Sequence, residues 1–202
     1  MITVKRKTTE SEITVTLDAG APAADYREKI NTPYTFLNHM IEMIVHRAGV
    51  NIGVEVKLAK FQLSHVVCED AGQALGKAAA EFIARRRSAY AFGDGFGMID
   101  EARAFAAFSF ESRSLLQFTK LAEIPAQVEG MDSDDVKTFI EGFVIGAGCT
   151  LHIELLSGEN GHHIWEAVFR AIGVAFGKVI AENKLRENLT SGVAGRIEWS
   201  VE

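Results

Sequence analysis

The segment Gly158–Glu166 contains the residue types best suited to chemistry in this sequence. Two adjacent histidines, His162 and His163, are followed one helical turn later by Glu166. At i, i+4 spacing His162 and Glu166 share one helix face, whereas His163 projects about 100° away from them. Glycines before the pair and an apolar run after it predict a turn that enters a helix. Such a helix could supply ligands to two neighbouring metal ions, and the alternative is a chance pair of histidines at a helix N-terminus.

A second segment repeats this arrangement. His65 and Glu69 also stand at i, i+4 spacing, at the start of an alanine-rich helix predicted over 64–84 with Ser64 as its N-cap. Superposing His65 on His162 places Glu69 on Glu166, at an offset of 97 residues from position 65 to position 162. An offset close to half the chain length predicts an internal duplication, with halves 1–97 and 98–202 that form one compact unit.

Imidazole together with carboxylate is a ligand set that suits Mn, Fe, Ni or Zn. The two cysteines have no metal-binding spacing, which argues against a structural zinc site. Any single histidine is more often a hydrogen-bonded core or surface residue, and His46 is interpreted in that way. For the two histidine and carboxylate pairs the repetition favours metal binding. No phosphate-binding loop or nucleophile elbow is present, and Gly93–Gly97 is interpreted as a flexible connection.

The elements that would position these residues follow from apolar periodicity. Alternation predicts a half-buried strand within 2–17, and intervals of three and four predict a helix over 34–48 that carries His39. In order after it come a strand over 50–63, the helix over 64–84, strands over 102–110 and 114–118, a helix over 133–147, and a strand over 150–156 with His152. This order predicts an α+β fold with helices packed on one face of a sheet.

Composition limits the class of protein. A chain of 202 residues is long enough for a proper core, and its net charge of −6 gives no general attraction for nucleic acid. The one basic run, Arg85–Arg87, is typical of the solvated end of a helix. Nothing in the sequence resembles a signal peptide or a membrane span, and the cysteine usage fits a reducing compartment. We therefore expect a soluble cytoplasmic protein that binds neither nucleic acid nor membranes.

Over nearly its whole length the chain resembles imidazoleglycerol-phosphate dehydratase, an enzyme of histidine biosynthesis. The most specific likeness is Gly158–Arg170, which is similar to the family pattern Gly-x-Asn-x-His-His-x-x-Glu-Ala-x-Phe-Lys. Further stretches are similar to family motifs: Arg6 to Ile13, Phe36–Met40, His65–Asp70, Asp100–Ala102 and Leu151–Ile153.

The resemblance implies a fold and a metal centre. The fold would be two βββαβα-like halves of the ribosomal protein S5 domain 2-like class, assembled into a large homo-oligomer with two manganese ions bound between subunits. Carried over by position, the ligands of one ion would be His65, Glu69, His152 and His163. Those of the other would be His39, His162 and Glu166.

The resemblance also implies the chemistry, which is loss of water from imidazole glycerol phosphate. Metal ions would act as Lewis acids while a carboxylate moves protons. Glu10 aligns with the substrate-contacting glutamate of the family and is the predicted catalytic residue. Arg113 and Arg170 are the predicted contacts of the anionic substrate.

Several family positions differ in this chain. Val66 stands at the place of a further metal-binding histidine, Ala91 replaces an arginine, and Asn38 replaces an aspartate. Leu189 and Ser191 stand where the family has the serine and lysine that hold phosphate. These differences leave two alternatives open: a divergent paralogue that keeps one metal site but has another substrate or only a binding role, and a purely structural oligomer.

Overall fold

The first half of the chain forms one four-stranded sheet with two helices. The computed structural model describes residues 1–86, 88–193, 195, 197 and 200. The first elements are β1 (Ile2–Lys7), β2 (Ser11–Ala19), a 3-10 turn (Tyr26–Lys29), β3 (Ile30–Asn31), α1 (Thr35–Ala48), β4 (Val50–Leu58) and α2 (Ser64–Ala84). The strands lie in the order β1-β2-β4-β3, and only β3 runs parallel to its neighbour β4.

The second half repeats this architecture. Its elements are β5 (Phe92–Ile99), β6 (Ala102–Ser109), β7 (Leu115–Lys120), a hairpin of β8 (Gln127–Val128) and β9 (Met131–Asp132), α3 (Ser133–Ala147), β10 (Thr150–Ser157), α4 (Gly161–Val179) and a 3-10 turn (Lys184–Arg186). The sheet order β5-β6-β10-β7 matches that of the first half, with β7 parallel to β10. The predicted α+β fold of two βββαβα halves is confirmed. The border at residue 97 stays a prediction, and β5, which crosses that residue, pairs with β6 of the second sheet.

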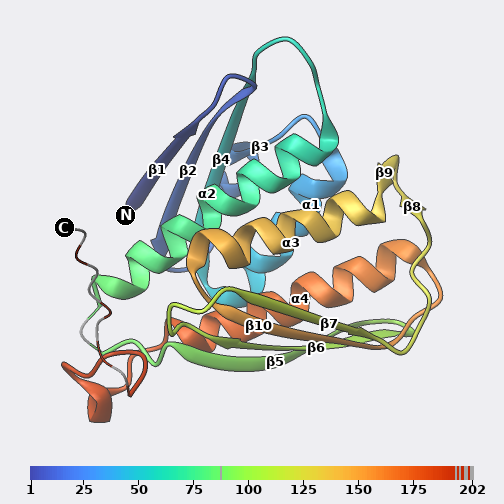
Figure 1. Cartoon of the computed structure of the whole chain (residues 1–202). Coiled ribbons are helices and arrows are strands. Elements are labelled where there is room, and N and C mark those ends of the chain that lie inside the picture. The colour runs from blue at the N-terminus through green and yellow to red at the C-terminus, as the bar shows by residue number, and fades with distance from the viewer. Residues whose placement is uncertain (87, 194, 196, 198–199, 201–202) are drawn as a thin grey trace.

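The four helices lie between the two sheets (Figure 1). Helix α2 packs on β1 and β2, and α4 packs on β5 and β6. Within the helical layer α2 contacts α3 and α1 contacts α4, so each helix pair joins the two halves. The apolar faces of both sheets and of all four helices merge into one buried core, to which Ile13, Val15 and Leu17 contribute as their alternation predicted.

The helix predictions are confirmed at 35–48, 64–84 and 133–147. Gly49 ends α1 in the left-handed region at φ 67°. The single strand expected within 2–17 is instead the antiparallel pair β1 and β2, and the strand expected to reach residue 63 ends at Leu58. The prediction of Ser64 as an N-cap was wrong: Leu63 occupies that position, and the Ser64 hydroxyl donates to the Asp135 carboxylate on α3 instead. Of the predicted basic helix end, Arg86 donates to the backbone oxygen of Ile180, and Arg87 lies outside the described residues.

The interpretation of Gly93–Gly97 as a flexible connection was wrong, because these residues form most of β5. Their glycines alternate with outward side chains and face α4. A Cβ atom on Gly97 would lie 2.1 Å from the backbone oxygen of Ala167, and one on Gly93 would lie 2.2 Å from that of Ala175. The glycines therefore allow the backbone of α4 to approach the sheet closely, and this contact sets the position of α4.

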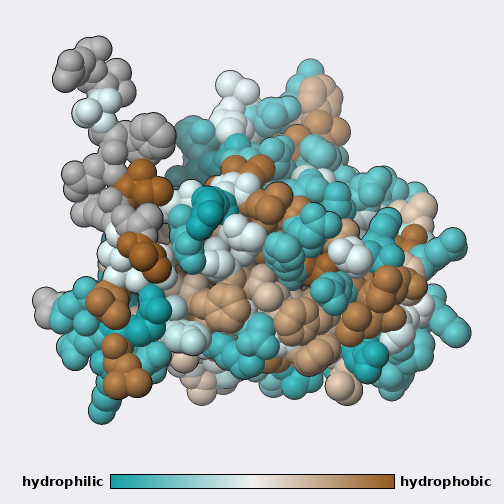
Figure 2. Space-filling view, turned by 60° about the horizontal axis from the view of Figure 1, so that its bottom comes forward, coloured by the Kyte–Doolittle hydropathy of each residue, from teal (hydrophilic) through white to brown (hydrophobic). Residues whose placement is uncertain are grey.

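The outer faces of the two sheets differ. The first carries mainly polar residues, among them Lys5, Lys7, Glu55 and Lys57. On the second, Phe92, Phe96 and Met98 of β5 are 48%, 56% and 60% exposed, and Leu115 of β7 is 52% exposed. Figure 2 shows hydrophobic residues grouped on this side of the molecule. Every described helix is too short or too polar to cross a lipid bilayer.

Candidate metal centre

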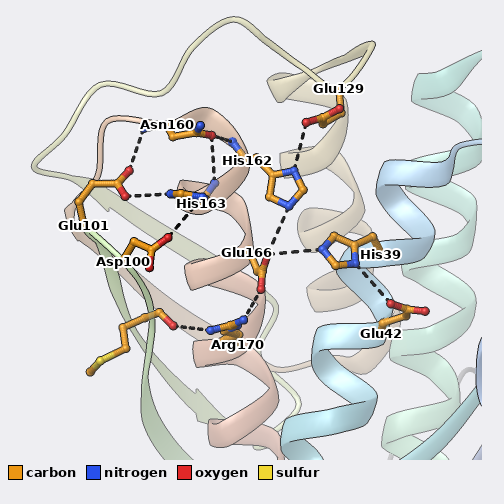
Figure 3. A network of polar contacts seen from close by, with 11 residues as sticks. His39, Glu42, Asp100, Glu101, Glu129, Asn160, His162, His163, Glu166 and Arg170 are labelled. Carbon is orange, nitrogen blue, oxygen red and sulfur yellow. Dashed lines mark hydrogen bonds and ion pairs between the residues drawn. The ribbon is translucent and has the colours of Figure 1, made fainter.

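Helices α1 and α4 bring His39, His162 and Glu166 together (Figure 3). One ligand atom from each of these side chains lies within 4.8 Å of the other two. Asn160 fixes the start of α4, because its side-chain oxygen accepts from the backbone N–H groups of His162 and His163. Gly173 of α4 allows α1 to approach, since a Cβ there would lie 3.0 Å from the backbone oxygen of Met43. The three ligands that the family resemblance implied for one of the two ions are thus gathered within this one chain.

The carboxylate of Glu166 is the centre of this cluster. Its Oε2 atom lies 3.4 Å from Nε2 of His39 and 3.3 Å from Nε2 of His162. Its other oxygen, Oε1, pairs with the guanidinium of Arg170, which also donates to the backbone oxygen of Met98. Glu166 is only 5% exposed, so the Arg170 pair compensates for the burial of its charge.

Each histidine has a second carboxylate at its outer nitrogen. Nδ1 of His39 lies 3.3 Å from Oε2 of Glu42, and Nδ1 of His162 lies 3.2 Å from Oε1 of Glu129. A neutral imidazole that donates from Nδ1 has its lone pair on Nε2. Two imidazole lone pairs and one carboxylate oxygen then point to the same place, and a divalent cation is the partner that satisfies all three. The donor set therefore fits a metal ion.

The cluster borders a cavity of about 550 Å³. Both histidines line it, and so do both of their carboxylate partners on the outer side. The remaining lining residues are Arg27, Thr35, Phe36 and Asn38. Arg27 reaches Glu42 at 2.8 Å, which places a positive charge at the rim. The cavity is large enough to admit a small polar substrate beside the ligand atoms.

His163 lies on another side of α4, as its spacing predicted, and it contacts Glu101. Its Nδ1 is 2.8 Å from Glu101 Oε2, while Glu101 Oε1 accepts from the backbone N–H groups of Glu159 and Asn160. The backbone N–H of Asn160, and after it the His163 ring, lower the pKa of Glu101 to about 2. The hydrogen bond with Glu101 in turn raises the pKa of His163.

The ligands predicted for the other ion do not gather within one protomer. His65 and Glu69 lie on α2, where Nδ1 of His65 is 3.5 Å from Asp135 Oδ1 and Glu69 accepts from Gln73. His152 is exposed on the outer face of the second sheet, beside Ala107 of β6 and Gln117 of β7. Among the described residues, the one cluster of three potential metal ligands is His39, His162 and Glu166. His46, which was not expected to bind metal, is exposed and packs edge-on against Tyr26.

The predicted substrate contacts lie apart from one another. Glu10 is exposed in the turn between β1 and β2. Arg113 pairs with Glu111 at 2.9 Å and lines a cavity of about 760 Å³ together with Arg86 and Ser191. Arg170 is half-buried and engaged by Glu166 and the Met98 backbone. Of the positions that differ from the family, Val66 is half-buried on α2, and Ala91 is buried with a φ of 59°.

Three carboxylates of the site were not predicted as functional. Glu42 could have been found, because it follows His39 by three residues in a predicted helix and therefore shares its face. Glu101 stands in the Asp-Glu-Ala motif, but its contact with His163 depends on the fold. Glu129 lies at the tip of a hairpin whose strands have two residues each, and so short a hairpin leaves no period in the sequence.

Comparison with known proteins gives a consistent result. The model of the family described as imidazoleglycerol-phosphate dehydratase matches residues 32–176. The protein of that name from Caldicellulosiruptor saccharolyticus is 35% identical over 170 residues, covering 84% of this chain and 86% of the relative. A Burkholderia cenocepacia relative of the same name is 35% identical over 175 residues, with 85% and 86% covered. The solved structure from Staphylococcus aureus has a TM-score of 0.75 at 27% identity and covers 90% of this chain and 100% of its own. That from Pyrococcus furiosus has a TM-score of 0.77 at 27% identity, with 96% and 99% covered.

Proposed function

The chain belongs to the imidazoleglycerol-phosphate dehydratase family and is a dehydratase of histidine biosynthesis, and we propose that its activity depends on a divalent metal ion held by His39, His162 and Glu166. The observation that supports this most strongly is the convergence of one ligand atom from each of the three on α1 and α4 within 4.8 Å. The proposed substrate is imidazole glycerol phosphate, and manganese is the proposed metal.

A divalent ion at this place would supply Lewis-acid chemistry beside the cavity. Residues around the three ligands place the ligand atoms for such an ion. Carboxylate oxygens of Glu42 and Glu129 lie 3.3 Å and 3.2 Å from the outer nitrogens of His39 and His162, the position of the carboxylates that commonly accompany metal-binding histidines. Arg170 pairs with Oε1 of Glu166, so the other carboxylate oxygen, Oε2, faces the two histidines.

Loss of water requires that one proton leave a carbon atom and that another reach the departing hydroxyl oxygen. Glu10 is the carboxylate proposed for this transfer. It lies outside the set of described residues that line the cavity, so this role requires a neighbouring protomer. The exposed position of Glu10 in a turn supports such a contact.

We further propose that the second ion is held between protomers by His65, Glu69, His152 and His163. His65 and His152 are exposed, and His152 lies on the same sheet face as Phe96 and Met98. A large exposed apolar face is typical of a protein interface, so a homo-oligomer built through this face would also cover it. Val66 stands where a family ligand is missing, and a lower metal affinity at that place is part of the proposal.

For the phosphate group of the substrate we propose Arg113. The cavity that it lines is also lined by Arg86, Thr190 and Ser191. Arg86 could therefore replace one of the cations missing at Ala91 and Ser191. Arg170 is a weaker candidate, because two of its nitrogens are engaged by protein oxygens. The cytoplasm is the proposed location.

The test is turnover of imidazole glycerol phosphate by purified protein reconstituted with manganese, with His162→Ala and His46→Ala as a matched pair. We expect product from the wild type and from His46→Ala and none from His162→Ala. A folded wild type that binds manganese but forms no product would favour the paralogue with another substrate, which Val66, Ala91 and Ser191 motivate. A folded wild type that binds no metal would contradict the metal-dependent function itself.

A further inference from the structure

The β8–β9 hairpin holds Glu129 in a backbone conformation that is unfavourable for a glutamate residue. Gln127 pairs with Asp132 and Val128 with Met131, so the turn between the strands consists of Glu129 and Gly130 alone. Both turn residues have positive φ, 47° and 78° respectively. Turns of this kind favour asparagine, aspartate or glycine at both positions, and a glutamate there is strained. Strain of this kind is a reason to look for a function of the residue.

The Glu129 side chain points to His162, which indicates what this residue does. Its Oε1 atom lies 3.2 Å from Nδ1 of His162, and both residues line the 550 Å³ cavity. Figure 3 shows the Glu129 carboxylate on one side of the His162 ring and Glu166 on the other. The Glu129 side chain is 57% exposed, so its contact with His162 adds little to the stability of the fold. A strained residue that stabilises the fold so little is better explained by what it does to His162.

We propose that Glu129 is a positioning residue of the metal site: it accepts the Nδ1–H of His162 and thereby holds the Nε2 lone pair toward Glu166. This inference rests on the proposed metal-dependent function. It adds that the strained β8–β9 hairpin positions one of the metal-binding histidines. Glu42 does the same for His39, but from the next turn of the same helix and without backbone strain. The orientation of His162 on α4 therefore depends on a different element of the chain, the β8–β9 hairpin, whereas that of His39 depends on its own helix.

Two variants separate positioning from a structural role. Glu129→Gly removes both the carboxylate and the strain, whereas Glu129→Gln keeps the strain and an amide oxygen that can still accept from Nδ1–H. We expect Glu129→Gly to raise the Tm by about 2 to 4 °C while it weakens manganese binding by about 10- to 100-fold. Glu129→Gln should leave the Tm unchanged and lose less affinity than Glu129→Gly.

The readouts are calorimetric titration with manganese and solid-state ¹⁵N NMR of the metal-free protein, with the His162 signal identified from its loss in His162→Ala. In the wild type His162 should carry its proton on Nδ1, and in Glu129→Gly the population with the proton on Nε2 should rise. An unchanged tautomer together with an affinity within twofold of the wild type would overturn the proposal. If the wild type binds no metal, the proposed function fails, and the tautomer measurement still decides whether Glu129 positions His162.

Discussion

Replacing His39 by alanine tests the metal centre with little risk to the fold, because His46→Ala on the same helix is a matched control. Both histidines lie on α1, where alanine is a strong helix former, and only His39 contacts Glu166. A ligand present at 100 times its Kd stabilises the folded state by about 2.7 kcal/mol. For a chain of this size manganese should therefore raise the Tm of the wild type by about 5 to 11 °C.

Losing His39 should weaken manganese binding at least as much as losing an outer-shell partner does, which is about 100-fold at the upper end. At the same manganese concentration the stabilisation then falls to about 0.4 kcal/mol, or a Tm shift of about 1 °C. The assay is a thermal melt with manganese or with chelator, combined with a metal count per protomer. His39→Ala should lose about half of one ion or more, together with most of the Tm shift, and His46→Ala should lose neither. If His39→Ala keeps the ion count and Tm shift of the wild type, the assignment of this site is refuted.

Three further outcomes follow from the same structure. Gly97→Ala should destabilise the protein by about 1 to 3 kcal/mol, because its Cβ would meet the Ala167 backbone oxygen at 2.1 Å, and chemical unfolding would measure this against the wild type. The Glu101 hydrogen bond raises the pKa of His163, so Glu101→Gln should lower that pKa in NMR titrations of metal-free protein. The loss of stability in Glu101→Gln should be largest at about pH 5 to 6, where His163 is protonated and Glu101 is ionised. It should shrink as the pH rises through the His163 pKa. Burial raises the pKa of Cys68 and of Cys149 to about 12, so neither thiol should react with a disulfide reagent at about pH 8 until the protein is unfolded.

The sequence was sufficient where local periodicity decides the structure. The apolar spacing in α1, α2 and α3 predicted their ends to within a residue, since each helix buries one continuous face. It failed at Gly93–Gly97, because glycines in a connection and glycines that press a strand against a helix look alike without the helix. Ser64 was misjudged for a similar reason: its partner, Asp135, lies 71 residues away.

The candidate metal site was also predictable from local spacing only in part. His162 and Glu166 could be paired by helical spacing, but their meeting with His39 depends on the packing of α1 against α4. Resemblance to a family supplied that link before the fold was known. Neither source could give the Glu129 contact, which depends on the conformation of one turn. His65 and Glu69 lie on α2, His152 on β10 and His163 on α4, and these four residues form no cluster within the described part of one chain.

The cluster of His39, His162 and Glu166 draws its members from both halves of the chain, so a metal ion bound there would link the two halves. Neither half would bind it tightly if expressed alone, so manganese would promote the docking of two separately produced halves. At the equivalent junction between α2 and α3, the described residues contain no cluster of three potential ligands within one chain. His39 is the fifth residue of α1, and the fifth residue of α3 is Lys137, whose ammonium group would repel a cation. A metal ion would therefore stabilise the contact between α1 and α4, and would not stabilise the equivalent contact between α2 and α3 within the same chain.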